Sequence, residues 1–117
     1  MAEKTLFQRI IDGEIPANFV YQDEHVVAIR DLHPAAPLHV LVIPRKPVPS
    51  LAHLEEEDGE LAGRLLLSVR RIAELEGVAE DGYRVVINTG EGGGQTVPHL
   101  HLHLLAGRMF EEGSMRG

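Results

Sequence analysis

Apolar and polar residues follow two different periods along this 117-residue chain, which predicts a mixture of helices and strands. In the segment TLFQRIIDGEI, apolar residues recur at a four-residue step, which predicts a short helix that Gly13 can end. A longer helix is predicted from Glu56 to Glu76, with an apolar stripe on one side. That stripe consists of Leu61, Leu65, Val69, Ile72 and Leu75.

The other regular segments have the alternation or the continuous apolar character of β-strands. NFVYQDEHVVAIRD predicts a hairpin, because β-branched and aromatic residues flank a polar turn. LHVLVIP predicts a buried strand ending at Pro44, and YRVVINTG predicts another. HLHLHLL, residues 99–105, predicts the last strand. The order helix, three strands, helix, two strands is typical of an α+β domain with a largely antiparallel sheet.

Length and composition narrow the class of protein. We expect residues 1–117 to form a single domain with a core at about 5–108 and a partly mobile tail at 109–117. No segment approaches the ~20 apolar residues of a membrane span. The N-terminus lacks the plan of a signal peptide, so we expect a cytoplasmic protein without a membrane partner. The chain has no cysteine, which excludes disulfides and thiolate metal sites.

The net charge of −7 argues against a nucleic-acid partner, because such proteins need a basic face to neutralise phosphates. A small phosphorylated ligand remains compatible with this charge. Backbone N–H groups and imidazoles can bind a phosphate without a positive net charge. The glycine-rich loop GEGGGQT, residues 90–96, offers such N–H groups with little steric cover.

The strongest candidates for chemistry are His99, His101 and His103, which alternate with leucines. Side chains two apart on a strand share a face. The leucines should therefore pack on a helix, and the histidines should line the opposite surface as a row. Three imidazoles on one face favour a functional site over unrelated surface residues. Three further histidines, His25, His33 and His53, are predicted to be surface residues outside this site.

Two chemistries fit such a row. Neighbouring residues on one face of a strand lie ~6.6 Å apart, so His99 and His103 would be ~13 Å apart. A zinc ion needs nitrogens at ~2.0–2.1 Å, which all three imidazoles reach with difficulty. His39 could add a ligand from a neighbouring strand, so a metal site stays open, although we expect none. Alternatively, the central imidazole of His101 is a nucleophile toward phosphorus or acyl carbon, and its neighbours stabilise the phosphate oxygens.

The segment HLHLHLL resembles the signature of the histidine triad (HIT) superfamily, in which three histidines alternate with apolar residues. IIDGEIPANFVYQDEHVVAIRDLHPAAPLHVLVIPRK resembles the N-terminal half of its nucleotide-binding branch, Hint. YRVVINTGEGGGQTVPHLHLHLLAGR resembles the C-terminal core of that branch, so the likeness covers residues 5–108. It implies a HIT-like fold with a mainly antiparallel five-stranded sheet and two helices. It also implies a homodimer in which the sheets of two subunits join.

The resemblance further implies an enzyme, a purine nucleoside phosphoramidase that works without a cofactor. Such a hydrolase cleaves the P–N bond of purine nucleoside 5′-phosphoramidates through a nucleotidyl-histidine intermediate and releases a nucleoside monophosphate such as AMP. Aminoacyl adenylates are further candidate substrates. Three alternatives stay open: a nucleotide-binding module with little turnover, a dinucleoside polyphosphate hydrolase of a sister branch, and a zinc protein of the same fold.

The resemblance assigns a role to each of four histidines. His101 matches the nucleophile, and His103 matches the histidine that contacts the α-phosphate. His99 matches the first triad member, which supports the site through hydrogen bonds. His39, in the segment PLHVLVIP, matches a fourth active-site histidine on the adjacent strand.

The resemblance also implies a set of nucleotide-binding residues. Asp31 matches the carboxylate that holds the ribose hydroxyls, and Asn88 matches an asparagine near the ribose and the phosphate. The phosphate loop is matched by Gly94, Gln95 and Thr96, with Thr96 near the leaving group. The apolar pocket for the base is matched by Phe7, Ile10, Ile29 and Leu32. Asp31 could instead cap the turn before Pro34, and Asn88 could be a turn residue. The sequence departs from the family at Ala106, where glycine is frequent, and in a tail without the Trp-Pro ending of animal members.

Overall fold

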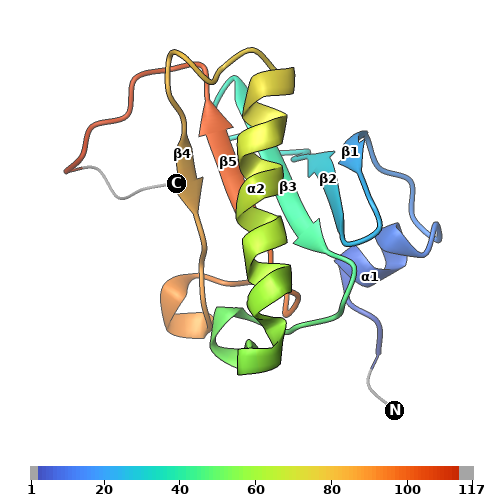
Figure 1. Ribbon diagram of the computed structural model, residues 1–117. Coiled ribbons are helices and arrows are strands. Elements are labelled where there is room, and N and C mark those ends of the chain that lie inside the picture. Colours follow the sequence, from blue (N-terminus) through green and yellow to red (C-terminus); the bar gives the residue numbers. More distant parts are fainter. Residues whose placement is uncertain (1–2, 114–117) are drawn as a thin grey trace.

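A five-stranded antiparallel sheet with strand order β1-β2-β3-β5-β4 lies at the centre of the protein (Figure 1). The structure is a computed structural model and describes residues 3–113. Its elements are α1 (Leu6–Ile11), β1 (Phe19–Gln22), β2 (Val26–Arg30), β3 (Leu38–Pro44), α2 (Gly59–Leu75), β4 (Arg84–Val86) and β5 (Leu102–Ala106). Three short 3-10 helices cover Leu51–His53, Glu56–Asp58 and Glu91–Gly93. The predicted fold class, order of elements and antiparallel sheet are confirmed.

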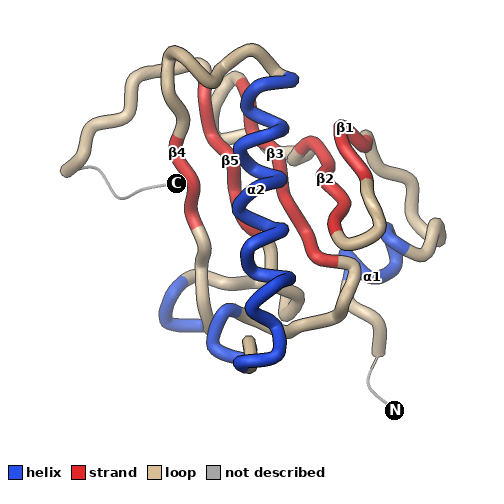
Figure 2. The backbone as a smooth tube through the Cα atoms, in the orientation of Figure 1, coloured by secondary structure: helices blue, strands red, loops and turns tan. Residues whose placement is uncertain are grey.

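The two helices pack on opposite faces of the sheet, because the buried strands alternate between two apolar clusters. On one face, Val40 and Val42 of β3 join a cluster that includes Leu65 and Val69 of α2. On the other face, Leu41 and its neighbour two residues on join Phe7 and Ile10 of α1. α2 lies along the sheet in Figure 2, whereas α1 lies beside β2 and β3 on the far side. The sheet is therefore buried on both faces, and the face under α1 is available for a site.

The long predicted helix is shorter than expected at its N-terminal end. Residues 56–58 form a 3-10 turn, and α2 begins only at Gly59. The side chain of Glu55 accepts a hydrogen bond from the turn while Asp58 accepts one from the Glu55 backbone, so a capping box fixes this entry. Of the predicted stripe, Leu65, Val69 and Ile72 are buried, whereas Leu75 is 54% exposed.

The histidine segment is a strand only in its second half. β5 begins at Leu102, so His99 and His101 precede the ladder, contrary to the prediction. The physical reason is that Pro98 cannot donate to a ladder, and the Leu100 amide donates instead to the carbonyl oxygen of Val48 at 2.7 Å. The separation of faces is nevertheless confirmed, because Leu100, Leu102 and Leu104 lie in the cluster under α2.

The tail was predicted to be partly mobile, and only its first part is described. Phe110 lies under the guanidinium groups of Arg84 and Arg108, which are 4.9 and 4.1 Å from the centre of its ring. Residues 114–117, on which the rest of that prediction falls, lie outside the described residues. Within residues 3–113, neither helix combines the length and the apolar character that crossing a membrane requires.

Candidate active site

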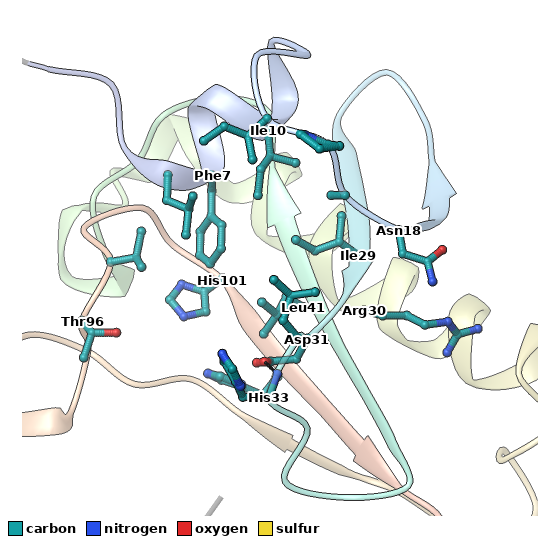
Figure 3. Close-up of a pocket in the computed structure, with 17 residues that line it drawn as sticks. Phe7, Ile10, Asn18, Ile29, Arg30, Asp31, His33, Leu41, Thr96 and His101 are labelled. Carbon is teal, nitrogen blue, oxygen red and sulfur yellow. Dashed lines mark hydrogen bonds between the residues drawn. The ribbon is translucent and has the colours of Figure 1, made fainter.

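A cavity of about 430 Å³ opens on the face of the sheet that α1 covers (Figure 3). α1 forms one wall, the end of β2 and the middle of β3 form another, and the segments around Thr96 and His101 close the third. It is lined by Leu6, Phe7, Ile10, Ile15, Pro16, Ala17, Asn18, Ile29, Arg30, Asp31, Leu32, His33, Leu41, Thr96, Val97, His101 and His103. An apolar half under α1 thus adjoins a polar half built of imidazoles and a carboxylate.

The structure brings most of the sequence-predicted residues to this cavity. Eight of them line it: Phe7, Ile10, Ile29, Asp31, Leu32, Thr96, His101 and His103. His39 and His99 lie behind the lining and contact the two lining imidazoles through hydrogen bonds. Asn88, Gly94 and Gln95 are outside the lining. The prediction that the histidines form a surface row is wrong, because α1 covers them and leaves His99 only 1% and His101 only 7% exposed.

His101 occupies the centre of the site with one ring nitrogen fixed. Its Nδ1 lies 2.8 Å from the carbonyl oxygen of His99. A carbonyl oxygen can only accept, so Nδ1 carries the proton and Nε2 keeps a lone pair. The ring of Phe7 meets the imidazole edge-on at 4.8 Å between centroids, which restricts its rotation. His101 is therefore oriented with the lone pair of its Nε2 available to a ligand in the cavity.

A hydrogen-bonded chain likewise sets the proton positions of His39 and His103. The backbone N–H of Ala35 donates to Nδ1 of His39 at 3.0 Å, so His39 carries its proton on Nε2. That Nε2–H donates to Nδ1 of His103 at 2.8 Å. His103 must then carry its own proton on Nε2, which makes this atom a donor. The loop between β2 and β3 thus determines that His103 has a donor for an oxygen atom in the cavity.

Burial keeps this group of imidazoles neutral at pH 7. Desolvation, together with the neighbouring His101 and His39, lowers the pKa of His103 to about 4 against the opposing effect of Asp31. Desolvation also lowers the pKa values of His101, His99 and His39. The 3.5 Å contact between Asp31 Oδ2 and His39 Nε2 is therefore not an ion pair at this pH. Neutral imidazoles provide both a lone pair and N–H donors, which imidazolium ions could not.

The two carboxylate oxygens of Asp31 have different surroundings: one is bonded to the backbone, and the other lies near the imidazoles of the site. Its Oδ1 accepts a hydrogen bond from the backbone N–H of His33 at 2.8 Å, so the carboxylate does cap the turn, as one interpretation predicted. Its Oδ2 lies on the side of His39, and the residue lines the cavity. The two interpretations of this residue are thus compatible, because a carboxylate has about four acceptor positions.

The side chain of Gln95 holds the glycine-rich loop in place and does not line the cavity. The side-chain oxygen of Gln95 accepts from the Gly90 N–H at 2.8 Å, and its nitrogen donates to the carbonyl oxygens of Pro49 and Val97. Gly94 adopts a φ of 84°, a left-handed conformation that glycine tolerates best. These contacts fix the loop immediately before Thr96, the loop residue that lines the cavity.

Sequence reasoning missed several residues of the site. Asn18 and His33 line the cavity, although both are exposed and His33 was predicted to lie apart from the site. Thr5 lies behind it, with its hydroxyl 3.2 Å from Nδ1 of His99. The spacing of Thr5 and Gln8 is that of a helix-capping signature, which could have indicated Thr5. Nothing in the pattern distinguishes Asn18 from an ordinary loop residue.

A metal ion could bind at one point of the site. The ligand atoms of Asp31, His39 and His103 lie within 4.8 Å of one another. Both nitrogens of His39 are hydrogen-bonded, so an ion there would have to replace the bond between His39 and His103. One carboxylate and two imidazoles are a donor set that zinc accepts. The geometry therefore permits a metal only at the cost of the chain that orients His103.

Comparison with known proteins agrees with this arrangement. Residues 12–110 match the HIT domain family. The chain belongs to the HIT family. A HIT-like protein of Synechococcus elongatus is 55% identical over 108 residues, with 92% of this chain and 94% of the relative covered. The purine nucleoside phosphoramidase of Escherichia coli is 49% identical over 108 residues, with 92% of this chain and 91% of that protein covered.

Solved structures of the HIT family share the fold as well. The crystal structure of a HIT family hydrolase from Legionella pneumophila superposes with a TM-score of 0.91 and 43% identity, with 94% of this chain and 98% of that chain covered. These similarities extend over nearly the whole of both chains. Together they identify the chain as an enzyme, a hydrolase of the HIT family.

Proposed function

We propose that this HIT protein is a cytoplasmic purine nucleoside phosphoramidase that cleaves the P–N bond of purine nucleoside 5′-phosphoramidates. The observation that carries the proposal is the hydrogen bond between His101 Nδ1 and the His99 carbonyl oxygen, which leaves Nε2 as a nucleophile in the cavity. The 49% identity to the purine nucleoside phosphoramidase of Escherichia coli supports the class of substrate. Aminoacyl adenylates, whose reacting phosphorus is attached to the same nucleoside, are further candidates.

The two halves of the cavity fit the two ends of a nucleotide. The purine base would pack among Phe7, Ile10 and Ile29, which are buried between α1 and the sheet. The ribose hydroxyls would donate to the carboxylate of Asp31, which has acceptor positions left beside its turn contact. The α-phosphate would then lie at His101. Asn88, Gly94 and Gln95 would act on the phosphate indirectly, through the conformation of the loop that Gln95 holds.

In the proposed mechanism, the Nε2 lone pair of His101 attacks the α-phosphorus while the P–N bond breaks. The leaving nitrogen takes up a proton from solvent near Thr96 and departs as the amine. The N–H of His103 donates to a phosphate oxygen and stabilises the charge that develops there. Nδ1 of His101 keeps its proton, so the nucleotidyl-imidazole is cationic and a good leaving group. Water then attacks the phosphorus and gives up a proton to solvent, the electron pair of the P–Nε2 bond returns to Nε2, and the nucleoside monophosphate is released.

Release of AMP from adenosine 5′-phosphoramidate tests this proposal directly. Purified protein should release AMP and ammonia in equal amounts, and a chelator should leave the rate unchanged because no step requires a metal ion. AMP binding without turnover would favour a nucleotide-binding module, and faster cleavage of a dinucleoside polyphosphate would favour the activity of the sister branch. Loss of activity with the chelator, restored by zinc, would support a metal at Asp31, His39 and His103.

The proposal includes a homodimer in which two sheets join. β4 is an edge strand, and its Val85 is 39% exposed. On α2, Leu66 and Leu67 are 60% and 58% exposed, so the described residues offer both an open strand edge and unburied apolar side chains on a helix. Light scattering should give twice the 12.9 kDa of the chain, and replacing Leu66 and Leu67 by glutamate should lower that mass. A monomeric mass for the wild type at micromolar concentration would contradict the dimer.

A further inference from the structure

The hydroxyl of Thr5 makes two hydrogen bonds at the start of α1. It accepts one from the backbone N–H of Gln8 at 3.1 Å, which caps the helix. It also lies 3.2 Å from Nδ1 of His99, a residue 94 positions away in the chain. The first contact is an ordinary local cap. The second connects the helix that covers the cavity to the histidine segment beneath it.

The direction of the contact between Thr5 and His99 follows from the other side of the imidazole. Nε2 of His99 lies 2.9 Å from the carbonyl oxygen of Pro44, which can only accept, so Nε2 carries the proton. Nδ1 of this neutral ring is then an acceptor. The hydroxyl proton of Thr5 must therefore point to Nδ1, while the oxygen lone pair accepts from Gln8. One hydroxyl satisfies both neighbours, and the His99 ring is held at both nitrogens.

His99 in turn positions His101. The backbone carbonyl of His99 accepts the Nδ1–H of His101 at 2.8 Å. Phe7 follows Thr5 by two residues, and its ring meets the imidazoles of His99 and His101 at 6.2 and 4.8 Å between centroids. Figure 3 shows Phe7 reaching from α1 to His101. α1 thus contacts the histidine segment by a polar link at Thr5 and an aromatic link at Phe7.

We propose that Thr5 is a positioning residue of the reaction: its hydroxyl fixes the ring and tautomer of His99, and so holds the carbonyl group that orients His101. This inference rests on the proposed function, because it concerns the alignment of the proposed nucleophile. It adds a residue outside the cavity lining to the site. It also makes α1 both the wall against the base and the support of the nucleophile.

The capping role and the positioning role of Thr5 can be separated by substitution. Thr5→Ser keeps a hydroxyl for both hydrogen bonds. Thr5→Asp keeps an acceptor for the Gln8 N–H, since aspartate is a good helix cap, but it cannot donate to Nδ1 of a neutral His99. Thr5→Val has nearly the shape of threonine and makes neither bond. A residue that only caps the helix would tolerate Thr5→Asp, whereas a positioning residue would not.

Three measurements on these variants decide between the roles. For adenosine 5′-phosphoramidate, we expect kcat to fall about three- to tenfold in Thr5→Asp and Thr5→Val, the range of one neutral hydrogen bond. It should stay within about twofold of wild type in Thr5→Ser, whose two bonds are intact. The Kd for AMP should be unchanged in all three. The melting temperature should fall only in Thr5→Val, the variant without a cap.

Nitrogen-15 spectra of labelled histidine supply a readout that does not depend on turnover. The wild type and Thr5→Ser should show His99 protonated on Nε2 only, and Thr5→Asp should change the tautomer or the protonation of that ring. Full kcat in Thr5→Asp with unchanged His99 signals would overturn the proposal, as would a loss of kcat that follows the melting temperature. A wild type that releases no AMP would refute the proposed function instead, and the His99 signals would still decide whether the contact with Thr5 exists.

Discussion

The His101→Ala variant is expected to lose several orders of magnitude in kcat toward adenosine 5′-phosphoramidate while still binding AMP. The substitution removes the only protein atom proposed to form a bond with phosphorus, so the two-step route is lost. Binding depends on other groups, chiefly the apolar wall at Phe7 and Ile29 and the carboxylate of Asp31. Steady-state kinetics and a calorimetric Kd for AMP, measured on the same preparations, separate the two effects.

A matched histidine control shows whether the loss is specific. His25 lies in the turn between β1 and β2, where its side chain is 38% exposed and its Nε2 is 3.0 Å from a carboxylate oxygen of Glu24. His25→Ala should leave kcat and the Kd for AMP unchanged. A nucleotide bound covalently to the wild type during turnover, absent in His101→Ala, would identify the attacking residue by mass spectrometry. Near-normal turnover by His101→Ala would show that the mechanism is not covalent at this residue.

The same nucleophile predicts the acidic limb of the pH profile. Burial lowers the pKa of His101 below its ordinary 6.5, so the neutral form persists into more acidic solution. As pH falls, kcat/KM should therefore begin to decline only below pH 6.5, because this parameter reports the free enzyme. A decline that begins above pH 6.5 would contradict the protective effect of burial under α1.

The sequence predicted the direction of side chains in this protein better than their burial. Alternation in residues 99–104 correctly predicted that Leu100, Leu102 and Leu104 face α2, because that rule is local to a strand. It could not predict that α1, far away in sequence, covers the other face and buries His99 and His101. Nor could it predict that the Leu100 N–H donates a hydrogen bond to the carbonyl oxygen of Val48, so that the ladder begins only at Leu102. These features depend on contacts between segments that are distant along the chain.

Proton positions in the site are equally beyond the sequence. The resemblance indicated which histidines gather, but the donor or acceptor role of each nitrogen follows from its partner in space. Ala35 sets the tautomer of His39 through its backbone N–H, so the identity of its side chain gives no indication of this role. Gln95 was expected at the phosphate but holds the loop from within, and a sequence cannot distinguish these uses of an amide. Chemistry was thus predictable at the level of residues, and not at the level of atoms.

The chain from Ala35 through His39 to His103 leads to the other large expected effect. His103→Ala should lower kcat by about 10²–10³, the usual loss when one donor to a developing oxyanion is removed. His39→Ala should cost roughly tenfold, because His103 then loses the Nε2–H partner that fixes its tautomer but keeps its imidazole. KM should change less than kcat in both variants, since the donor is proposed to act mainly on the transition state.

The double variant distinguishes a relay from two independent contributions. If His39 acts through His103, removing both should cost no more than removing His103 alone, which is a strong non-additivity. His39 also lies 3.5 Å from Oδ2 of Asp31, so it could instead support the ribose contact. In that case the two losses would multiply, and His39→Ala would raise KM more than it lowers kcat. A multiplicative result would therefore assign His39 to ribose binding. It would also mean that another contact fixes the tautomer of His103, because a residue that acts only through His103 can have no effect once His103 is removed.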